Sequence, residues 1–176
     1  MNIAIIGFGY WGPNLVRNFN SVTNCKVKYV CDFRAERLAI VNKQYPSIET
    51  TNDFEFVLKD SSVDAVVIAT PVFTHFDLAK KALLAGKNVL IEKPMTSTSD
   101  EAKTLKELAD KMQKVLMVDH TFLYTGAVQK MKALIQEGNI GKIQYFDSTR
   151  INLGLFQPDI NVLWDLAIHD LSILSA

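Results

Sequence analysis

Short runs of apolar, mostly β-branched residues alternate along the chain with longer stretches of mixed character. The runs span residues 2–6, 26–31, 64–69, 88–91 and 115–118. Residues 2–6 and 64–69 are apolar almost throughout, as is typical of strands that are covered on both faces. Strands that alternate with helices predict crossover units on a parallel sheet.

Two of the intervening stretches, residues 34–44 and 74–86, have a helical pattern. Thr74 stands at the position of an N-cap, where a hydroxyl accepts from a free backbone N–H group. Gly86 stands just past the last turn, where helices commonly end on a glycine. The 74–86 stretch is therefore predicted to be a helix with a defined start and end.

Residues 98–113 carry the clearest helix signal. Thr98 is followed three residues later by Glu101, which predicts a capping box. One face of the stretch is apolar, at Leu105, Leu108, Ala109 and Met112. Five strands interleaved with such helices predict a doubly wound α/β domain with a parallel Rossmann sheet over residues 1–119.

The pattern changes after residue 119. Residues 125–138 are helical, with an inward face of Val128, Met131 and Ile135 and a stop at Gly138. Residues 143–151 alternate like a strand, and residues 162–176 are helical again. A lone strand and a lone apolar helix need neighbours. We therefore expect residues 120–176 to begin a second, α+β domain for substrate binding and oligomerisation, whose remainder lies outside this sequence.

The charge of the chain is balanced, with 19 basic and 19 acidic residues among 176, and no basic stretch stands out. A nucleic acid or an anionic membrane would require a concentrated positive surface. Neither is expected as a partner. The first residues lack the basic segment and the long apolar segment of a signal peptide, and no apolar run reaches the ~18 residues of a membrane span.

The two cysteines, Cys25 and Cys31, lie six residues apart. On one strand this separation is roughly 20 Å, far beyond the reach of a disulfide. No zinc-ligand partners lie near them in the sequence, and no metal site is expected. We expect reduced thiols and a cytoplasmic protein.

Three glycines, Gly7, Gly9 and Gly12, spell G-x-G-x-x-G between the first predicted strand and a helix. In a dinucleotide-binding turn the first glycine makes the bend, the second lets the pyrophosphate approach, and the third lets helix and strand pack closely. The phosphates then face the N–H groups at the start of the helix. Tyr10 and Trp11 either shield the pyrophosphate or pack on a neighbouring helix. The residues between the glycines are candidate cofactor contacts as well: Phe8, Tyr10 and Trp11.

Asp32 lies 20 residues after Gly12, at the end of the second predicted strand. A carboxylate at this position can hold the adenosine ribose hydroxyls and repels a 2′-phosphate, which favours NAD over NADP. Arg34 and Arg37 weaken that preference, because a nearby arginine can accept the phosphate. Both are equally well explained as exposed charges on a helix.

Two further groups of polar residues follow the third and fourth predicted strands. Ligands of open α/β sheets bind outside the carboxyl ends of the strands. These residues should therefore edge the crevice that holds the nicotinamide end of a dinucleotide, and we take them as candidate cofactor contacts: Thr70, Pro71, His75, Glu92 and Lys93. Pro94 ends the pairing of the fourth strand, since it has no N–H group to donate.

Together, the strings GFGYWG, ATPVFTH, IEKP and WDLAIHD make the chain resemble the glucose–fructose oxidoreductase and inositol dehydrogenase (Gfo/Idh/MocA) family. The resemblance implies that Lys93 lies beside nicotinamide and substrate and that Pro94 often follows a cis peptide. It also implies that the histidine of D-x-x-x-H-D, here His169 between Asp165 and Asp170, helps to transfer the proton.

Oxidation of a secondary alcohol suits these residue types. A hydride moves to C4 of the nicotinamide while the hydroxyl proton leaves, and a histidine can accept that proton near neutral pH. A lysine bonded to the same oxygen stabilises alkoxide character or moves the proton itself. Whether Lys93 or His169 is the base stays open. Asp165 is spaced to orient His169, four residues along a helix.

The strings GYWGPNLVRNF, DHTFLY, RINLG and VLWDLAIHDLSIL look like the sugar-nucleotide branch of this family. The resemblance implies oxidation of a sugar ring, often at C3 of a UDP-linked amino sugar or uronic acid, in surface-polysaccharide pathways. It also implies a homo-oligomer. Candidate substrate contacts are Lys93, Tyr124, Arg150, Asn152 and His169.

The leading hypothesis is thus an NAD-dependent sugar or nucleotide-sugar dehydrogenase. A redox-assisted glycosidase or lyase that retains its NAD and a non-catalytic cofactor-binding regulator are the alternatives. The joint presence of Lys93 and His169 favours an enzyme. We expect residues 1–119 to bind a dinucleotide by themselves and residues 120–176 to be too few to enclose a substrate, so that these 176 residues alone would not turn over efficiently.

Overall fold

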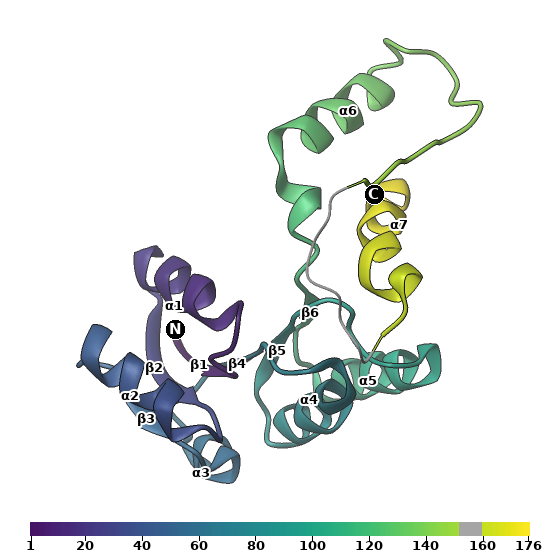
Figure 1. Cartoon of the computed structure of the whole chain (residues 1–176). Helices are drawn as coiled ribbons and strands as arrows, with labels where there is room; N and C mark the ends of the chain where they lie inside the picture. Colours follow the sequence, from purple (N-terminus) through teal and green to yellow (C-terminus); the bar gives the residue numbers. More distant parts are fainter. Residues whose placement is uncertain (152–159) are drawn as a thin grey trace. The chain divides into compact units, whose positions relative to one another are not determined.

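A computed structural model describes residues 1–151 and 160–176 (Figure 1). The chain divides into two compact units, residues 1–118 and residues 119–176. The expected boundary followed residue 119.

The first unit is built on one parallel sheet of six strands. Their order is β3-β2-β1-β4-β5-β6, so the direction in which strands are added reverses between β1 and β4. This is the order of a doubly wound dinucleotide-binding fold and confirms the predicted fold class. The strands are β1 (Asn2–Ile6), β2 (Lys26–Cys31), β3 (Glu49–Thr51), β4 (Ala65–Ile68), β5 (Asn88–Ile91) and β6 (Leu116–Val118).

Helices cover both faces of this sheet. They are α1 (Gly12–Ser21), α2 (Ala35–Gln44), α3 (Phe54–Lys59), α4 (His75–Leu84) and α5 (Ser99–Met112). Successive strand residues point to opposite faces: Ile3 and Ile5 pack with the buried residues of α1 and α2, whereas Ala4 and Ile6 pack with those of α3, α4 and α5. β1 is therefore buried on both sides, as its unbroken apolar run predicts.

The helix ends agree with the sequence in two of three places. Thr98 and Glu101 form the predicted capping box of α5, and Gly86 follows α4 with a φ of +75°. Thr74 stands at the N-cap position of α4, but its hydroxyl does not cap the helix. It donates instead to the carbonyl oxygen of Pro71 at 2.7 Å, since a 3₁₀ turn at Val72–Thr74 precedes the helix.

The second unit contains a 3₁₀ turn at Thr121–Tyr124, helix α6 (Gly126–Gln136), a π-helical turn at Leu163–Ala167 and helix α7 (Ile168–Leu174). The strand predicted over residues 143–151 is wrong: this segment forms no strand. An alternating segment becomes a strand only when another strand bonds to it, and the described part of this unit offers none.

The predicted inward face of α6 is also only partly correct. Val128 is buried, but Met131 and Ile135 are 45% and 40% exposed. Among the described residues of this unit, too little apolar surface faces α6 to cover the whole stripe.

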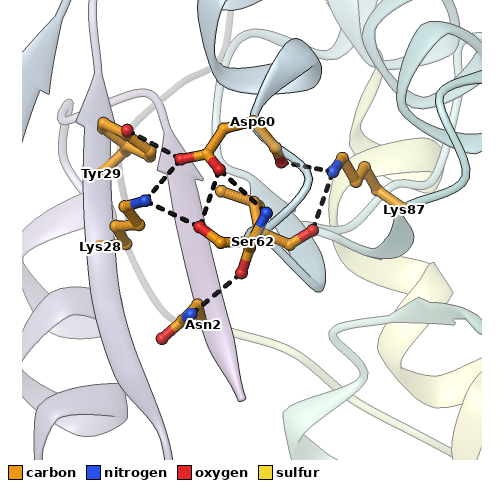
Figure 2. A network of polar contacts seen from close by, with 7 residues as sticks. Asn2, Lys28, Tyr29, Asp60, Ser62 and Lys87 are labelled. Atoms are coloured by element: carbon orange, nitrogen blue, oxygen red, sulfur yellow. Dashed lines mark hydrogen bonds and ion pairs between the residues drawn. The ribbon is translucent and has the colours of Figure 1, made fainter.

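A network of polar contacts lies at the amino-terminal edge of the sheet (Figure 2). Asp60, which follows α3, accepts hydrogen bonds from Lys28 and Tyr29 on β2 and from the N–H and hydroxyl of Ser62. The hydrogen bond from the Lys28 ammonium, together with the Ser62 and Tyr29 donors, holds the pKa of Asp60 far below its usual value. The carboxylate therefore ties the α3–β4 connection to β2.

Lys87, just before β5, extends this network into the interior. Its side chain is buried, and its ammonium donates to the carbonyl oxygens of Asp60 (2.7 Å) and Val63 (2.9 Å). A buried cation is tolerated only where its N–H groups have acceptors, and the end of α3 supplies one of them. β5 is thereby fixed against the same connection.

We predict that Asp60→Asn lowers the melting temperature at neutral pH, because Lys28 loses a charged acceptor. A carboxyl with a depressed folded pKa stabilises the protein above its unfolded pKa of about 3.9 and loses that contribution as the pH falls toward the folded value. The gap between the two melting curves, followed by circular dichroism, should therefore narrow below about pH 4.

Asp100→Asn is the matched control for this measurement, because the side chain of Asp100 is 90% exposed. It should shift the melting temperature little at any pH. A gap for Asp60→Asn that is the same at pH 7 and at pH 3 would show that the charge of this carboxylate does not stabilise the fold.

Candidate functional site

The carboxyl ends of the central strands lie level with one another. Three hydrogen bonds join the residue after one strand to the last residue of the neighbouring strand: Gly7 N–H to Cys31 O (2.8 Å), Ala69 N–H to Ile6 O (2.8 Å) and Glu92 N–H to Ile68 O (2.9 Å). Strands are spaced by about 4.8 Å, so the row from Asp32 to Glu92 spans roughly 14 Å. The segments singled out after β1, β2, β4 and β5 thus meet at one edge of the sheet.

Gly7 and Gly12 are required by the fold itself. Gly7 has a φ of +96°, and a Cβ atom on it would lie 2.5 Å from the carbonyl oxygen of Ala69. A Cβ atom on Gly12 would lie 2.5 Å from the carbonyl oxygen of Gly7. These glycines permit the tight turn and the close approach of α1 to the strands.

Gly9 differs from the other two. Its φ is not in the left-handed region, and a Cβ atom there would meet only the Nη2 atom of Arg34, at an ordinary 3.6 Å. Among the residues that the structure describes, no steric contact demands a glycine here. The open space over Gly9 fits a ligand that lies against the backbone, as a pyrophosphate does in a dinucleotide-binding turn.

The start of α1 also fits an anion. Trp11 occupies the N-cap position, and its side chain makes no capping hydrogen bond. The first N–H groups of a helix have no intrahelical partner and carry partial positive charge. An anionic ligand over Gly9 would therefore face an uncapped helix N-terminus.

The three residues between the glycines have different environments. Tyr10 and Trp11 are exposed, and their rings are stacked with centroids 6.3 Å apart. Phe8 is only 1% exposed and packs in the core with Ile3 and Leu15. This corrects the expectation for the Phe8 side chain, which points into the core because the turn follows a strand buried on both faces.

Asp32 is buried and accepts hydrogen bonds from two neighbours. Its Oδ2 atom accepts from the N–H of Phe8 at 2.7 Å, and Arg34 donates from its N–H, Nε and Nη2 groups at 2.9–3.0 Å. Burial alone would raise the pKa of Asp32, but the bonds from Arg34 and Phe8 outweigh it and lower the pKa below its usual value. The group is thus a carboxylate at the end of β2, where a ribose diol is expected.

His75 joins the turn after β4 to the turn after β5. Its side chain is 1% exposed, with Nε2 2.8 Å from the carbonyl oxygen of Thr70 and Nδ1 3.0 Å from that of Pro94. The ring therefore faces backbone carbonyl oxygens inside the protein, between the turns that follow β4 and β5. Its position makes it a brace between the two turns that carry Thr70 and Lys93.

The turn after β5 has the backbone that the resemblance implies. The peptide bond between Lys93 and Pro94 is cis. Glu92 and Lys93 are half-buried, and Pro94 is buried. Thr70 follows the neighbouring strand β4, and its hydroxyl forms a hydrogen bond of 2.6 Å with the hydroxyl of Thr74. Polar groups thus line the edge where β4 and β5 end.

Four side chains of the second unit form one cluster, with the Phe122 ring at its centre. Arg150 donates to both carboxylate oxygens of Asp170, at 2.7 and 2.9 Å, and its guanidinium carbon lies 4.8 Å from the centre of the Phe122 ring. The His169 ring lies edge-on to Phe122, with centroids 4.7 Å apart. The hydrogen bond from Arg150 lowers the pKa of Asp170. Arg150 and His169, both singled out from the sequence, therefore lie close together.

Phe122 was missed as a site residue, and its only sequence signal is its place in the string DHTFLY. Tyr124, a candidate substrate contact, is 66% exposed. Asn152 lies outside the described residues. Asp165 lies in the π-helical turn rather than in a regular α-helix, so the four-residue spacing to His169 does not by itself place both side chains on one face.

In residues 1–151 and 160–176, no helix is long and apolar enough to cross a membrane, and no three His, Cys, Asp or Glu side chains lie together as metal ligands. Cys25 and Cys31 are free thiols, and burial raises the pKa of Cys31 to about 11.

Comparison with known proteins gives consistent matches. The protein named "Uncharacterized oxidoreductase YdgJ" of Escherichia coli is 35% identical over 93% of this chain and 46% of its own length. The UDP-N-acetylglucosamine 3-dehydrogenase of Acidithiobacillus ferrooxidans is 32% identical over 98% of this chain and 53% of its own length. The chain thus spans about half the length of the curated relatives it matches.

A solved structure is similar over a comparable part of the chain. The crystal structure of an NAD-binding protein from Listeria innocua has a TM-score of 0.73 and 32% identity, and the match covers 80% of this chain and 41% of that one. Residues 1–120 match the family described as "Oxidoreductase family, NAD-binding Rossmann fold". The level strand ends, the open Gly9 and the carboxylate at the end of β2 are those of such a fold, and the chain belongs to this Gfo/Idh/MocA oxidoreductase family.

Proposed function

We propose that the protein is an NAD-dependent oxidoreductase that moves a hydride from a ring hydroxyl of a sugar, in particular a nucleotide sugar, to the nicotinamide. The alignment of the strand ends carries this proposal. It brings the glycine turn, Asp32 and the Glu92–Lys93 turn to one edge of the sheet, within the length of an extended dinucleotide.

In this proposal, different residues of the first unit bind different parts of the cofactor. The pyrophosphate lies over Gly9 at the start of α1, the adenosine ribose lies at Asp32, and the nicotinamide lies beyond the ends of β4 and β5 near Thr70, Pro71 and Glu92. Tyr10 and Trp11 flank the phosphates. NAD, when bound, supplies the hydride acceptor.

Lys93 and His169 carry the proton chemistry in this proposal. An ammonium group that donates to the substrate oxygen stabilises alkoxide character as the hydride leaves. An imidazole accepts the hydroxyl proton near neutral pH. His75 holds the Lys93 turn in place through the Pro94 carbonyl, and Asp165 assists His169.

A nucleotide sugar is the substrate class that we favour. The relative from Acidithiobacillus ferrooxidans, named a UDP-N-acetylglucosamine 3-dehydrogenase, supports it, whereas a less similar relative from Bacillus subtilis is named a scyllo-inositol 2-dehydrogenase. We assign Arg150, Tyr124 and Asn152 to substrate contacts. We further propose a homo-oligomer that acts in cytoplasmic synthesis of surface-polysaccharide sugars.

The direct test uses the complete polypeptide that contains these residues, mixed with NAD and UDP-N-acetylglucosamine, with scyllo-inositol as comparison. We expect NADH absorbance to rise with the nucleotide sugar. Consumption of the sugar without NADH would point to a redox-assisted glycosidase or lyase. Binding of NAD without consumption of either compound would favour a regulator.

Lys93→Ala should lower turnover by about a hundredfold or more, the usual cost of losing a proton-transfer or oxyanion-stabilising group. The dissociation constant of NAD should stay within about twofold, because phosphate contacts dominate its binding in this proposal. Lys103→Ala, an exposed lysine on α5, is the charge-matched control. Unchanged turnover of the Lys93 variant would remove this residue from the mechanism.

Gly9→Ala should separate ligand binding from folding. Its Cβ atom has room in the free protein, so the free energy of unfolding should change by no more than about 0.5 kcal/mol. The affinity for NAD should fall about tenfold or more, equivalent to a loss of at least 1.4 kcal/mol, because the methyl group enters the pyrophosphate space. Quenching of Trp11 fluorescence offers the measurement.

Gly12→Ala is the contrasting variant. Its Cβ atom would overlap the Gly7 carbonyl, so this change should destabilise the fold itself by about 1–3 kcal/mol. Equal NAD affinity for Gly9→Ala and the unsubstituted protein would mean that no phosphate lies over Gly9.

A further inference from the structure

The ribose-binding carboxylate of Asp32 is already occupied in the free protein. A carboxylate offers about four lone-pair positions to donors. All four are used here: Oδ2 accepts from Phe8 N–H at 2.7 Å and Arg34 Nη2 at 2.9 Å, and Oδ1 accepts from Arg34 N–H at 2.9 Å and Nε at 3.0 Å. No further donor can bond to Asp32 until one of these leaves.

The four bonds are not equally permanent. The N–H groups of Phe8 and Arg34 belong to the backbone of the glycine turn and of the start of α2. The other two come from the Arg34 guanidinium, whose side chain is 33% exposed while that of Asp32 is 2% exposed. A ribose diol also donates two hydrogen bonds. The guanidinium therefore holds the two positions that the ribose hydroxyls would take.

The guanidinium also lies over the ligand side of the turn. A Cβ atom on Gly9 would approach the Nη2 atom of Arg34 to 3.6 Å and no other atom of residues 1–151 and 160–176 within 4 Å, apart from those of the chain neighbours of Gly9. The central carbon of the guanidinium lies 5.4 Å from the centre of the exposed Phe33 ring. It is thus next to the space assigned to the pyrophosphate and covers Asp32 on that side.

We propose that Arg34 is an internal competitor for the adenosine-ribose subsite, which must leave Asp32 when NAD binds and then becomes the partner of a 2′-phosphate when NADP binds. The proposal rests on the cofactor site described under the proposed function. Its consequence is that Arg34 opposes the binding of NAD and assists the binding of NADP. Arg34 therefore reduces the preference for NAD over NADP that Asp32 creates.

The physical reason lies in the strength of the bonds exchanged. When NAD binds, two charge-assisted bonds from a planar guanidinium are replaced by bonds from neutral hydroxyls, which are weaker. When NADP binds, the released guanidinium remains two residues from Asp32 and can form a bidentate pair with the phosphate. Without Arg34, only the repulsion between Asp32 and the phosphate would remain.

This sign distinguishes the proposal from an ordinary contact. An arginine that stacks on the adenine or bonds to the cofactor's phosphates would strengthen the binding of both cofactors. Its removal would weaken both. A competitor for Asp32 acts oppositely on the two cofactors.

The test is isothermal titration calorimetry of NAD and of NADP against the 176-residue chain and its Arg34→Ala variant. We expect the variant to bind NAD about fivefold more tightly, because a partly exposed charged pair no longer has to be broken. We expect it to bind NADP about tenfold more weakly, because a charge-assisted contact with the phosphate is lost. NAD affinity that is unchanged or lower in the variant overturns the proposal, and so does tighter binding of NADP.

Three further variants secure the interpretation. Lys43→Ala removes one positive charge from the exposed end of α2, roughly 13 Å along the helix, and should leave the ratio of the two affinities unchanged. Arg34→Lys keeps the charge without the planar pair, and should lie between the variant and the unsubstituted chain. In an Asp32→Ala background, Arg34→Ala should no longer increase the affinity for NAD, because the competitor has no target. An increase that persists there contradicts the mechanism.

The experiment also separates this proposal from the proposed function. If neither the chain nor any variant binds NAD or NADP, the cofactor site and the competition are both wrong. If NAD binds and Arg34→Ala weakens it, the cofactor site stands and only the competition is wrong. Circular dichroism of each variant establishes that the compared proteins are folded.

Discussion

The parallel pairing of β1 with β2 on one side and β4 on the other is the constraint on which the site depends. Because Ile6 pairs with both Cys31 and Ile68, the residues that follow these strands emerge side by side. A shift of one position would exchange the two faces of a strand and would move Gly7 away from Ala69. The buried alternation of Ile3, Ala4 and Ile5 between two cores therefore also fixes the place of the phosphate turn.

The sequence was sufficient wherever a segment carried its own signal. Short apolar runs located five strands, and the capping box located α5. β3 and α3 were missed because three polar residues and six mixed ones form no pattern. The segment 143–151 was misjudged because alternation only makes a strand possible. Motif spacing placed Phe8 in the glycine turn and His75 after β4. It did not give the direction of their side chains, which depends on the packing of strands distant in sequence.

Sequence motifs predicted more of the candidate site in the first unit than in the second. In the first unit, the three glycines of one motif are present for different reasons. A Cβ atom on Gly7 or Gly12 would overlap backbone atoms, whereas a Cβ atom on Gly9 would have room. In the second, Phe122 connects Arg150 with His169 although it lies 28 and 47 residues from them. Such a cluster has no linear spacing that would predict it, and its aromatic centre was missed for that reason.

His75 lies inside the protein and supports the turn that carries Lys93. It is the first residue of α4, and it faces the carbonyl oxygens of Thr70 and Pro94 from inside the protein. Any movement of α4 is therefore transmitted to the backbone next to Lys93. Natural variation at residue 75 should therefore change the reactivity of the Lys93 amine by shifting the backbone that carries it.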